Sequence, residues 1–580
     1  MGRITCYNNI VYSGDRSSAT VEARCRQHSS IVKMEYNWNN EGFQSASTYS
    51  VDSSLNGALQ LTVKATDAEG NEFTLSPEAP NFIFQNTPIN QSSVYEDGQK
   101  GGIIEMFGWP HKDIAEECEA LGKMGWMGVK VFPPNEGVFS YEWTDQGELN
   151  PWYWYYQPVS YNLNGRGGSR EELRDMIETC RSHGVRVYAD AVVNHMTGGG
   201  NDMLNHRNGS GYCATWSAKD STGSLYDKPS WYSTHNWTYE YNENTGEIPG
   251  LEYPSAAYNT MDFHCERSLN SWNDPFQLNN GWLSGLADLD TESDYVRERI
   301  AAYMTDLISI GFSGYRIDAA KHIQPDSLAA ILAKVKRNLG GGDLPSDFMT
   351  YLEVLIGGEA QLLECDYNSY EYSQYFDDAM AGAGLSESDI SKVKIWSSDY
   401  PKEMPICGYW IIPSERFAIE NDCHDDQVNG SSSRDMQDKG SVLIKEKNVP
   451  KHRGFEELLF NRTDANWKIR LVLSSYSYSA DGALGIPDGH SDCSQCVGEH
   501  CGDCHKTMPY SKAHDPNVCG YTCEVDGQWQ DGVYTRVHRD MAIIQAMRNW
   551  QGLPYIDNPV DLGLPSQCRV ESTSSQEFLQ

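Results

Sequence analysis

Acidic residues stand where short apolar runs of this chain end, and this pattern restricts the possible fold more than any other feature. Asp190 closes Val-Arg-Val-Tyr-Ala-Asp, Asp318 closes Gly-Tyr-Arg-Ile-Asp, Glu353 follows Met-Thr-Tyr-Leu, and His424-Asp425 comes soon after Phe-Ala-Ile-Glu-Asn. In a (β/α)8 barrel the C-terminal strand ends converge on one mouth, so carboxylates far apart in the chain can share a pocket. Such a pocket suits sugar hydrolysis, which needs one carboxyl group as an acid and another as a nucleophile or base.

Between residues 102 and 555 strand-like and helix-like patterns alternate, which predicts a parallel sheet. The fold class is therefore α/β, a (β/α)8 TIM barrel with a long loop subdomain after its third strand. The expected strands are 103–107, 129–132, 185–190, 314–318 and 349–354, and the expected helices are 113–124, 170–183, 294–310, 325–338 and 537–550.

Residues 1–95 have a different pattern, with short alternating strands at 30–38 and 58–65 and a turn at 67–71. This pattern predicts an N-terminal all-β, sandwich-like module. A carbohydrate-binding or spacer module and a packing appendage are equally compatible with it. The polar segment 88–102 is the expected linker. The predicted units are 1–95, the barrel parts 96–196 and 284–555, the loop subdomain 197–283, a Cys-rich loop 490–525 within the barrel, and a C-terminal tail 556–580.

Composition restricts the partners and the compartment. The formal net charge of −36 argues against nucleic acid and anionic membranes as partners. No apolar run approaches the roughly 20 residues of a membrane span. Sixteen cysteines indicate an oxidising compartment. We therefore expect a secreted monomer whose chain lacks its signal peptide.

Four motifs follow one another along the chain. They are Asp190-Ala-Val-Val-Asn194-His195, Gly314-Tyr-Arg316-Ile-Asp318-Ala-Ala-Lys321-His322, Glu353-Val, and Glu420-Asn421 followed by His424-Asp425. With these motifs in this order, the chain resembles the α-amylase family, glycoside hydrolase family thirteen, most closely its animal-type members, over about residues 102–555. Pro133-Pro134-Asn135-Glu136 and the segment 156–161 are further similarities.

The resemblance implies a catalytic set. Asp318 is the expected nucleophile, Glu353 the general acid and base, and Asp425 the carboxylate that binds and distorts the sugar. A retaining mechanism needs two carboxyl groups about 5–5.5 Å apart, one ionised and one protonated. Arg316 shares a strand face with Asp318, so we expect it to keep Asp318 ionised, while burial raises the pKa of Glu353. Without the other motifs, the Arg316–Asp318 pair would be interpreted as a buried ion pair inside the barrel.

The resemblance also implies the substrate-binding residues. His195 and His424 match histidines that bond sugar hydroxyls, and Asp190 matches a residue that organises the site. Arg316 is also expected to belong to the substrate-binding residues. The remaining candidates are Lys321 and His322 on the leaving-group side and Trp152, Tyr153, Tyr156 and Gln157 in a sugar-stacking segment.

The family carries a structural Ca²⁺ between the barrel and its long loop. The matching ligands are the side chains of Asn194 and Asp288 and the carbonyl groups of Asn279 and His322. All four donate oxygen, as a hard cation requires.

The fourth motif departs from the family pattern, because Asp422-Cys423 separates Asn421 from His424. Asp422 and Asp426 therefore stay open as alternatives to Asp425. Chloride-dependent relatives use an Asn before that His and a distant second Arg, whose expected position near Ala483 has no basic neighbour. We hypothesise that chloride is not required.

Three groups of cysteines are predicted to form disulfides. Cys118 and Cys180 match a disulfide of the animal enzymes, and Cys213 and Cys265 are a second candidate pair. The run Cys493, Cys496, Cys501 and Cys504 has a short spacing for zinc, so disulfides are favoured and zinc is the alternative.

These observations predict a retaining, endo-acting α-amylase whose substrates are starch, glycogen and maltooligosaccharides. The alternatives are an α-glucosidase or transglycosylase of the same family, or a non-catalytic glucan-binding protein.

Overall fold

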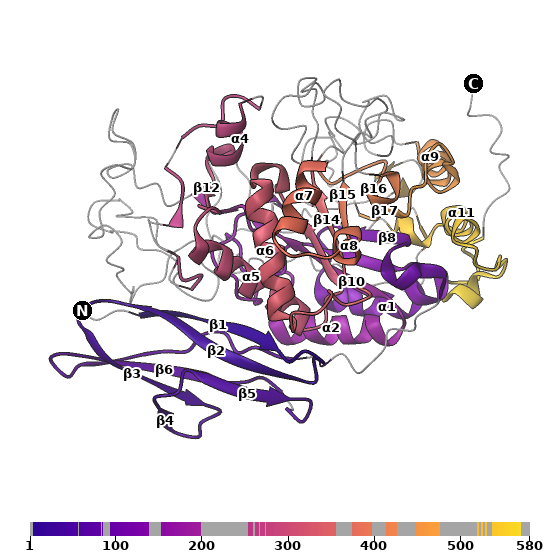
Figure 1. The fold of residues 1–580 in the computed structure, drawn as a ribbon. Helices are drawn as coiled ribbons and strands as arrows, with labels where there is room; N and C mark the ends of the chain where they lie inside the picture. Colours follow the sequence, from indigo (N-terminus) through magenta and orange to yellow (C-terminus); the bar gives the residue numbers. More distant parts are fainter. Residues whose placement is uncertain are drawn as a thin grey trace.

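Eight parallel strands close into a barrel in the computed structural model of the chain (Figure 1). The structure describes residues 4–55, 57–82, 84, 93–138, 152–198, 253, 255–258, 262–265, 267–272, 274–354, 374–396, 413–425, 443, 448–475, 519–520, 524–525, 528–529 and 536–569. The barrel strands are β8 (Gly101–Met106), β9 (Gly128–Val131), β10 (Arg186–Ala191), β13 (Gly314–Ile317), β14 (Met349–Glu353), β15 (Val393–Trp396), β16 (Phe417–Ile419) and β17 (Ile469–Leu473). The predicted (β/α)8 barrel is confirmed.

Helices surround the barrel and follow the βα rhythm of the sequence. They are α1 (His111–Met124), α2 (Arg170–Ser182), α5 (Asp294–Ser309), α6 (Pro325–Asn338), α7 (Gln374–Gly382), α8 (Glu387–Ser391), α9 (Val449–Asn461) and α11 (Met541–Gln551). Local sequence explains their ends: Ser169 and Glu172 form a capping box at the start of α2, and Pro325 occupies the first turn of α6.

The expected element boundaries agree with the structure to within a few residues. β8 begins at Gly101, inside the segment expected to be a linker. Gly314 is the first residue of β13. This position requires glycine, because its φ is 147° and a Cβ atom there would lie 1.8 Å from the Met349 carbonyl oxygen. The sequence patterns did not predict β15, β17, α7 or α9, since short buried strands and helices without alternation carry little signal.

The N-terminal module consists of two antiparallel sheets, as the alternation predicts. One sheet has the order β1 (Ile4–Tyr12), β2 (Ser18–Gln27), β5 (Thr48–Asp52), and the other has the order β4 (Phe43–Gln44), β3 (Ile31–Trp38), β6 (Leu61–Asp67), β7 (Glu72–Leu75). The expected turn at 67–71 is present, because the backbone N–H of Asn71 donates to Asp67 Oδ1 at 2.8 Å.

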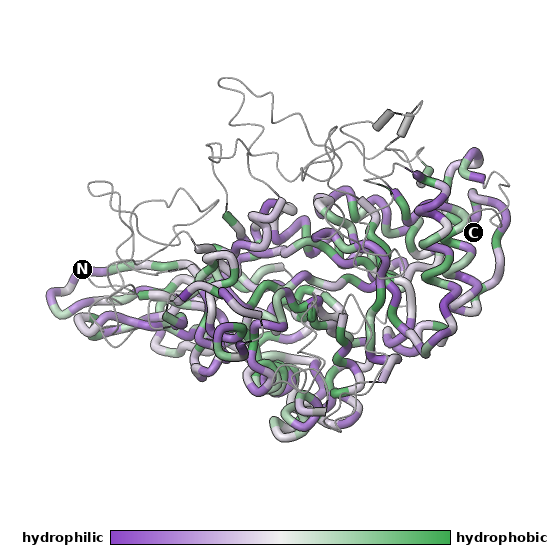
Figure 2. The backbone as a smooth tube through the Cα atoms, turned by 90° about the horizontal axis from the view of Figure 1, so that it is seen from above, coloured by the Kyte–Doolittle hydropathy of each residue, from purple (hydrophilic) through white to green (hydrophobic). Residues whose placement is uncertain are grey.

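This module packs against helices α5 and α6 of the barrel. Both views place it at one side of the barrel domain (Figures 1 and 2). The Tyr12 hydroxyl donates to Ser309 Oγ at 2.9 Å, and Arg16 Nε donates to the Leu339 carbonyl at 2.9 Å. Arg26 forms a two-pronged ion pair with Asp262, at 2.5 and 2.8 Å.

Part of the expected C-terminal tail also contacts the barrel. The 3-10 turn η14 (Pro559–Leu562) packs against α1, and Cys568 forms a disulfide with Cys519. The domain boundaries themselves stay predictions. Within the described residues, no helix has the length and apolar character needed to cross a membrane.

Candidate active site

Arg316 on β13 joins three of the acidic strand ends. Its Nη1 donates to Asp190 Oδ1 at 2.6 Å and to Asp318 Oδ1 at 2.9 Å, and its Nη2 lies 2.5 Å from Glu353 Oε1. The strand order β10-β13-β14 explains this convergence, since each acidic residue follows or ends a strand beside Arg316. The backbone N–H of Ala319 donates to the second oxygen of Glu353 at 2.8 Å.

The two expected catalytic carboxyl groups are buried, and the pKa of each is raised, as was expected for Glu353. Burial and the neighbouring Glu353 raise the pKa of Asp318 to about 8, although Arg316 opposes this shift. Burial also raises the pKa of Glu353, with Arg316 opposing and Asp425 adding to the shift. Arg316 favours the ionised form of Asp318, as expected, but burial and Glu353 outweigh it in the free protein. Two neighbouring carboxyl groups each disfavour ionisation of the other, which favours a state in which one of them is protonated.

A second set of charges lies beneath this cluster, and the sequence reasoning missed it. Lys130 on β9 donates to Glu105 Oε1 at 2.8 Å and to Asp190 Oδ2 at 2.9 Å. Lys130 and Glu105 are 1% and 4% exposed. The sequence did carry a signal for this pair, namely a charged residue within each apolar barrel strand. Such a residue is rarely buried without a partner.

His424 continues this set of charges toward the fourth strand end. Its Nδ1 lies 2.5 Å from Glu105 Oε1, and its Nε2 lies 3.4 Å from Asp425 Oδ2. The imidazole stacks with the rings of Phe107 and Tyr156, whose centroids lie 5.3 and 5.2 Å from its own. The two predicted residues of the fourth motif thus lie together.

The alternative third carboxylate, Asp422, has different surroundings. It is 1% exposed and its Oδ2 lies 3.2 Å from His452 Nε2 on α9. Asp425 is the residue whose charge acts on Glu353. The geometry favours Asp425 over Asp422, and Asp426 lies outside the described residues.

The predicted sugar-stacking segment forms the 3-10 turn η2 (Trp152–Tyr156) beside His424. The Trp152 and His424 rings are 5.7 Å apart, and the Tyr156 hydroxyl donates to Asp190 Oδ2 at 2.9 Å. Tyr153 packs edge-on against Trp152 at 6.0 Å. Gln157 follows the turn and accepts a hydrogen bond from Thr197 at 3.3 Å.

His195, Lys321 and His322 are all buried. His195 Nε2 lies 3.0 Å from the Tyr156 carbonyl, and burial lowers the pKa of His195 to about 4, so the ring is neutral. Lys321 Nζ lies 4.6 Å from the ring centroid of Trp272, a 38% exposed aromatic residue that the sequence reasoning had not singled out.

Two of the predicted Ca²⁺ ligands, Asn194 and Asp288, are in contact, and the other two, Asn279 and His322, lie on neighbouring segments. Strands β11 (His195–Met196) and β12 (Ala287–Asp288) bring Asn194 to Asp288, with Asn194 Nδ2 donating to Asp288 Oδ1 at 3.2 Å. Asn279, in helix α4 (Pro275–Asn280), donates to the Lys321 carbonyl at 3.4 Å, next to His322.

These residues offer amide, carboxylate and carbonyl oxygens, which fit a hard cation. Burial raises the pKa of Asp288 to about 6, and its Oδ2 lies 2.6 Å from His264 Nδ1. His264, Asp290 and Glu292 place ligand atoms within 4.8 Å of one another beside it.

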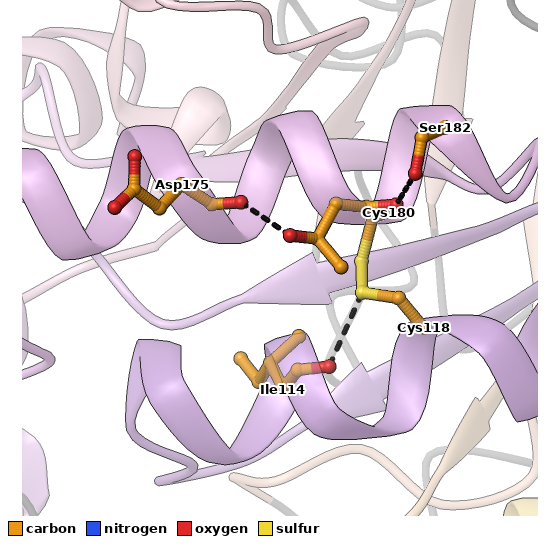
Figure 3. The surroundings of a disulfide bond; sticks show 6 residues. Ile114, Cys118, Asp175, Cys180 and Ser182 are labelled. Atoms are coloured by element: carbon orange, nitrogen blue, oxygen red, sulfur yellow. Dashed lines mark hydrogen bonds between the residues drawn. A yellow bond between two sulfur atoms is a disulfide. The ribbon is translucent and has the colours of Figure 1, made fainter.

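One cysteine prediction is confirmed. Cys118 on α1 and Cys180 on α2 form a disulfide that joins the two helices (Figure 3). Cys6 and Cys25 form a further disulfide between β1 and β2, which the sequence reasoning did not predict. Cys213 and the run from Cys493 to Cys504 lie outside the described residues.

The arrangement can perform acid–base and nucleophilic chemistry on an uncharged substrate. It offers two buried carboxyl groups on one arginine, a third, part-exposed carboxylate, and imidazole and aromatic rings beside them. One carboxyl can hold a proton while the other attacks or accepts one.

Comparisons with known proteins agree with this chemistry. Residues 150–339 match the family described as Alpha amylase, catalytic domain. The pancreatic alpha-amylase 2a5 of Mus musculus is 33% identical over 334 residues, which are 56% of this chain and 56% of that protein. The alpha-amylase of Thermomonospora curvata is 36% identical over 346 residues, which are 57% of this chain and 50% of that protein. The chain thus spans about half the length of the curated relatives that it matches.

Among solved structures, wild type alpha-amylase I from Eisenia fetida is similar to the chain with a TM-score of 0.47 and 23% identity over 78% of each chain.

Proposed function

We propose that the protein is a retaining, endo-acting α-amylase, from the premise that residues 150–339 match the α-amylase catalytic-domain family. Its substrates are starch, glycogen and maltooligosaccharides, and the bonds cleaved are internal α-1,4-glucosidic bonds. The observation that carries the proposal is the cluster in which Arg316 contacts Asp190, Asp318 and Glu353.

The proposed reaction uses the two carboxyl groups in turn. Glu353 gives its proton to the glycosidic oxygen while Asp318 attacks the anomeric carbon, which forms a covalent glycosyl-enzyme and releases the leaving sugar. Glu353 then takes a proton from water, which displaces Asp318. Arg316 stabilises the ionised Asp318, and Asp425 binds the sugar in a distorted ring form.

Binding of the glucan is assigned to residues around this cluster. The imidazoles of His195 and His424 hydrogen-bond sugar hydroxyls, and Asp190 organises Arg316. Aromatic rings offer flat apolar faces to pyranose rings. The other members of the proposed binding set are Trp152, Tyr153, Tyr156, Gln157, Arg316, Lys321 and His322.

We also propose a structural Ca²⁺ held by the side chains of Asn194 and Asp288 and the carbonyl groups of Asn279 and His322. When bound, the ion supplies charge that keeps the buried Asp288 carboxylate ionised. The protein's own residues carry out the bond cleavage.

The proposed setting is extracellular, with a polysaccharide as the partner and a monomer as the active form. The disulfides Cys6–Cys25, Cys118–Cys180 and Cys519–Cys568 support an oxidising compartment. The net charge of −36 argues against nucleic acid and anionic membranes as partners.

The test is the activity of Asp318→Asn and Glu353→Gln on starch. Each variant should lose release of reducing ends, by on the order of 10⁴-fold or more, since each removes a group that the reaction cannot replace. Glu456→Gln is the matched control, because Glu456 is a buried carboxyl on α9 that lies outside the cluster. Substantial activity in both site variants would rule out the mechanism.

Product analysis on long starch chains tests the finer claim. Mixed oligosaccharides at early times indicate internal cleavage. Glucose as the sole early product would assign the protein to the α-glucosidases, and lengthened chains would assign it to the transglycosylases.

A further inference from the structure

Two buried charged residues, Lys130 and Glu105, have no role in the proposed reaction. We propose that they are positioning residues for the reaction, which act through Asp190 and His424 and connect the two sides of the site. This inference rests on the proposed function.

The first step is the contact between Lys130 and Asp190. Lys130 Nζ donates to Asp190 Oδ2, while the other oxygen of Asp190 accepts from Arg316 Nη1. Asp190 is fully buried and lies between two cations, which outweigh burial and lower the pKa of its carboxyl. Lys130 therefore fixes the carboxylate that orients the guanidinium bound to Asp318.

The second step is the contact between Glu105 and His424. Burial would raise the pKa of Glu105, but Lys130 and His424 outweigh it and lower that pKa. The ionised Glu105 accepts the Nδ1–H of His424, and the rings of Phe107 and Tyr156, which stack on the imidazole, restrict its rotation. This leaves Nε2 facing Asp425 and the position of a sugar hydroxyl.

The contacts then form one continuous series from the nucleophile to the sugar-binding carboxylate. In order, it runs through Asp318, Arg316, Asp190, Lys130, Glu105, His424 and Asp425. Positive and negative groups alternate along it when His424 is protonated. A shift at any member therefore changes the geometry on both sides of the bound sugar.

A purely structural ion pair is the alternative. A buried pair of this kind can be replaced by apolar residues without loss of stability, so stability alone cannot separate the two roles. Three measurements distinguish a positioning role from a structural one: the catalytic rate per folded molecule, ground-state binding of a glucan, and the titration of His424.

The charged and titratable groups around His424 come from several elements. They are Glu105 on β8, Lys130 on β9, Tyr156 on η2, Asp190 on β10 and Glu353 on β14, with Asp425 beside the imidazole. Burial lowers the pKa of His424, and Asp425 and Glu105 outweigh it and raise that pKa.

The experiment compares Glu105→Gln, Lys130→Met and the double variant with the wild type. Lys394→Met is the matched control, because Lys394 is a buried lysine of barrel strand β15 that donates to the Ser391 carbonyl. We expect kcat on a maltooligosaccharide to fall about 10- to 100-fold in each single variant, the loss typical of removing a group that orients a functional histidine. The double variant should lose less than the product of the two, since the residues act in one series. The control should stay within about twofold.

Two further measurements do not depend on turnover. In a Glu353→Gln background, Glu105→Gln should weaken maltohexaose binding less than it lowers kcat in the active enzyme. In histidine-labelled protein, with the His424 signal assigned by its loss in His424→Gln, Glu105→Gln should lower the pKa of His424. Thermal unfolding of each variant checks that it is folded, and the isosteric Glu105→Gln serves if Lys130→Met does not fold.

Single variants that keep kcat within about twofold and leave the His424 titration unmoved would overturn the inference, whatever their melting temperatures. Wild-type protein without activity on any starch would instead refute the proposed function. The His424 titration would still decide whether Glu105 positions the histidine.

Discussion

At the scale of single residues, two aspartates in one short segment have opposite surroundings. The side chain of Asp422 is completely buried against His452, whereas that of Asp425 is 38% exposed beside His424. This difference separates a structural carboxylate from one that can reach a substrate, although their sequence context is nearly the same.

We predict that Asp425→Asn lowers kcat on starch on the order of a hundredfold or more, because hydrogen bonding to and distortion of the reacting sugar supply several kcal/mol. Asp422→Asn should keep kcat within a few-fold but lower the free energy of unfolding by about 1–3 kcal/mol, since it weakens a buried contact with His452. Kinetics and urea unfolding of both variants check this prediction. A large loss of kcat in Asp422→Asn with none in Asp425→Asn would reverse the assignment.

The residue scale also shows what a sequence pattern can and cannot identify. Asp190, Asp318 and Glu353 were found because each follows a recognisable strand. Lys130 and Glu105 lie within strands that were predicted, yet their partners are on other strands, so their pairing needed the barrel register. The raised pKa of Asp318 could not be predicted from sequence, because desolvation and the closeness of Glu353 are not visible there.

At the scale of elements, the segment after β16 decides how the fourth motif is used. β16 ends at Ile419, and residues 420–425 continue without strand structure. Asn421 Nδ2 donates to the Phe455 carbonyl at 2.8 Å, so this amide is directed at α9. With Asp422 and Cys423 inserted between them, Asn421 contacts α9 while His424 contacts Glu105.

This arrangement predicts that the enzyme does not require chloride. The side-chain amide of Asn421 is bonded to the Phe455 carbonyl on α9, so its N–H is not available to share an anion with Arg316. Dialysis into a chloride-free acetate buffer should change kcat on starch by less than about twofold, compared with a sample to which chloride is returned. Activity that falls when chloride is removed and recovers when it is restored would contradict the prediction.

At the scale of the whole molecule, the N-terminal module is part of one packed body with the barrel. Glu78, which follows β7, accepts from the backbone N–H of Leu163 at 2.7 and 2.9 Å and from Arg170 Nη1 at 3.0 Å. Arg170 also makes a two-pronged contact with Asp306 on α5. A carboxyl of the module, with 13% of its side chain exposed, therefore lies in the interface with the barrel.

This interface predicts a pH dependence of stability. Burial raises the pKa of Glu78 from 4.5 to about 7, although Arg170 opposes the shift. The folded protein then holds this proton more tightly than the unfolded chain, so the contribution of Glu78 to stability is largest below pH 4.5 and is lost as the pH rises through 7. The difference in free energy of unfolding between wild type and Glu78→Gln should fall by about 3 kcal/mol over this window.

Urea unfolding at pH 4.5 and at pH 7.5 measures this difference. Glu69→Gln is the control, since Glu69 lies in an exposed turn of the same module. A difference that stays constant between the two pH values would show that Glu78 does not couple the interface to pH.

The sequence by itself determined the barrel class, the alternating strands of the N-terminal module and the order of the acidic strand ends. These features follow from local periodicity and from residues at strand ends, which each segment carries in its own sequence. Only the tertiary structure decided which carboxylates share Arg316, that Lys130 joins Asp190 to Glu105, and that Asp422 turns to His452 while Asp425 stays at the site. The physical reason is that desolvation and ion pairing depend on distances between strands, which closure of the barrel sets and no single segment contains.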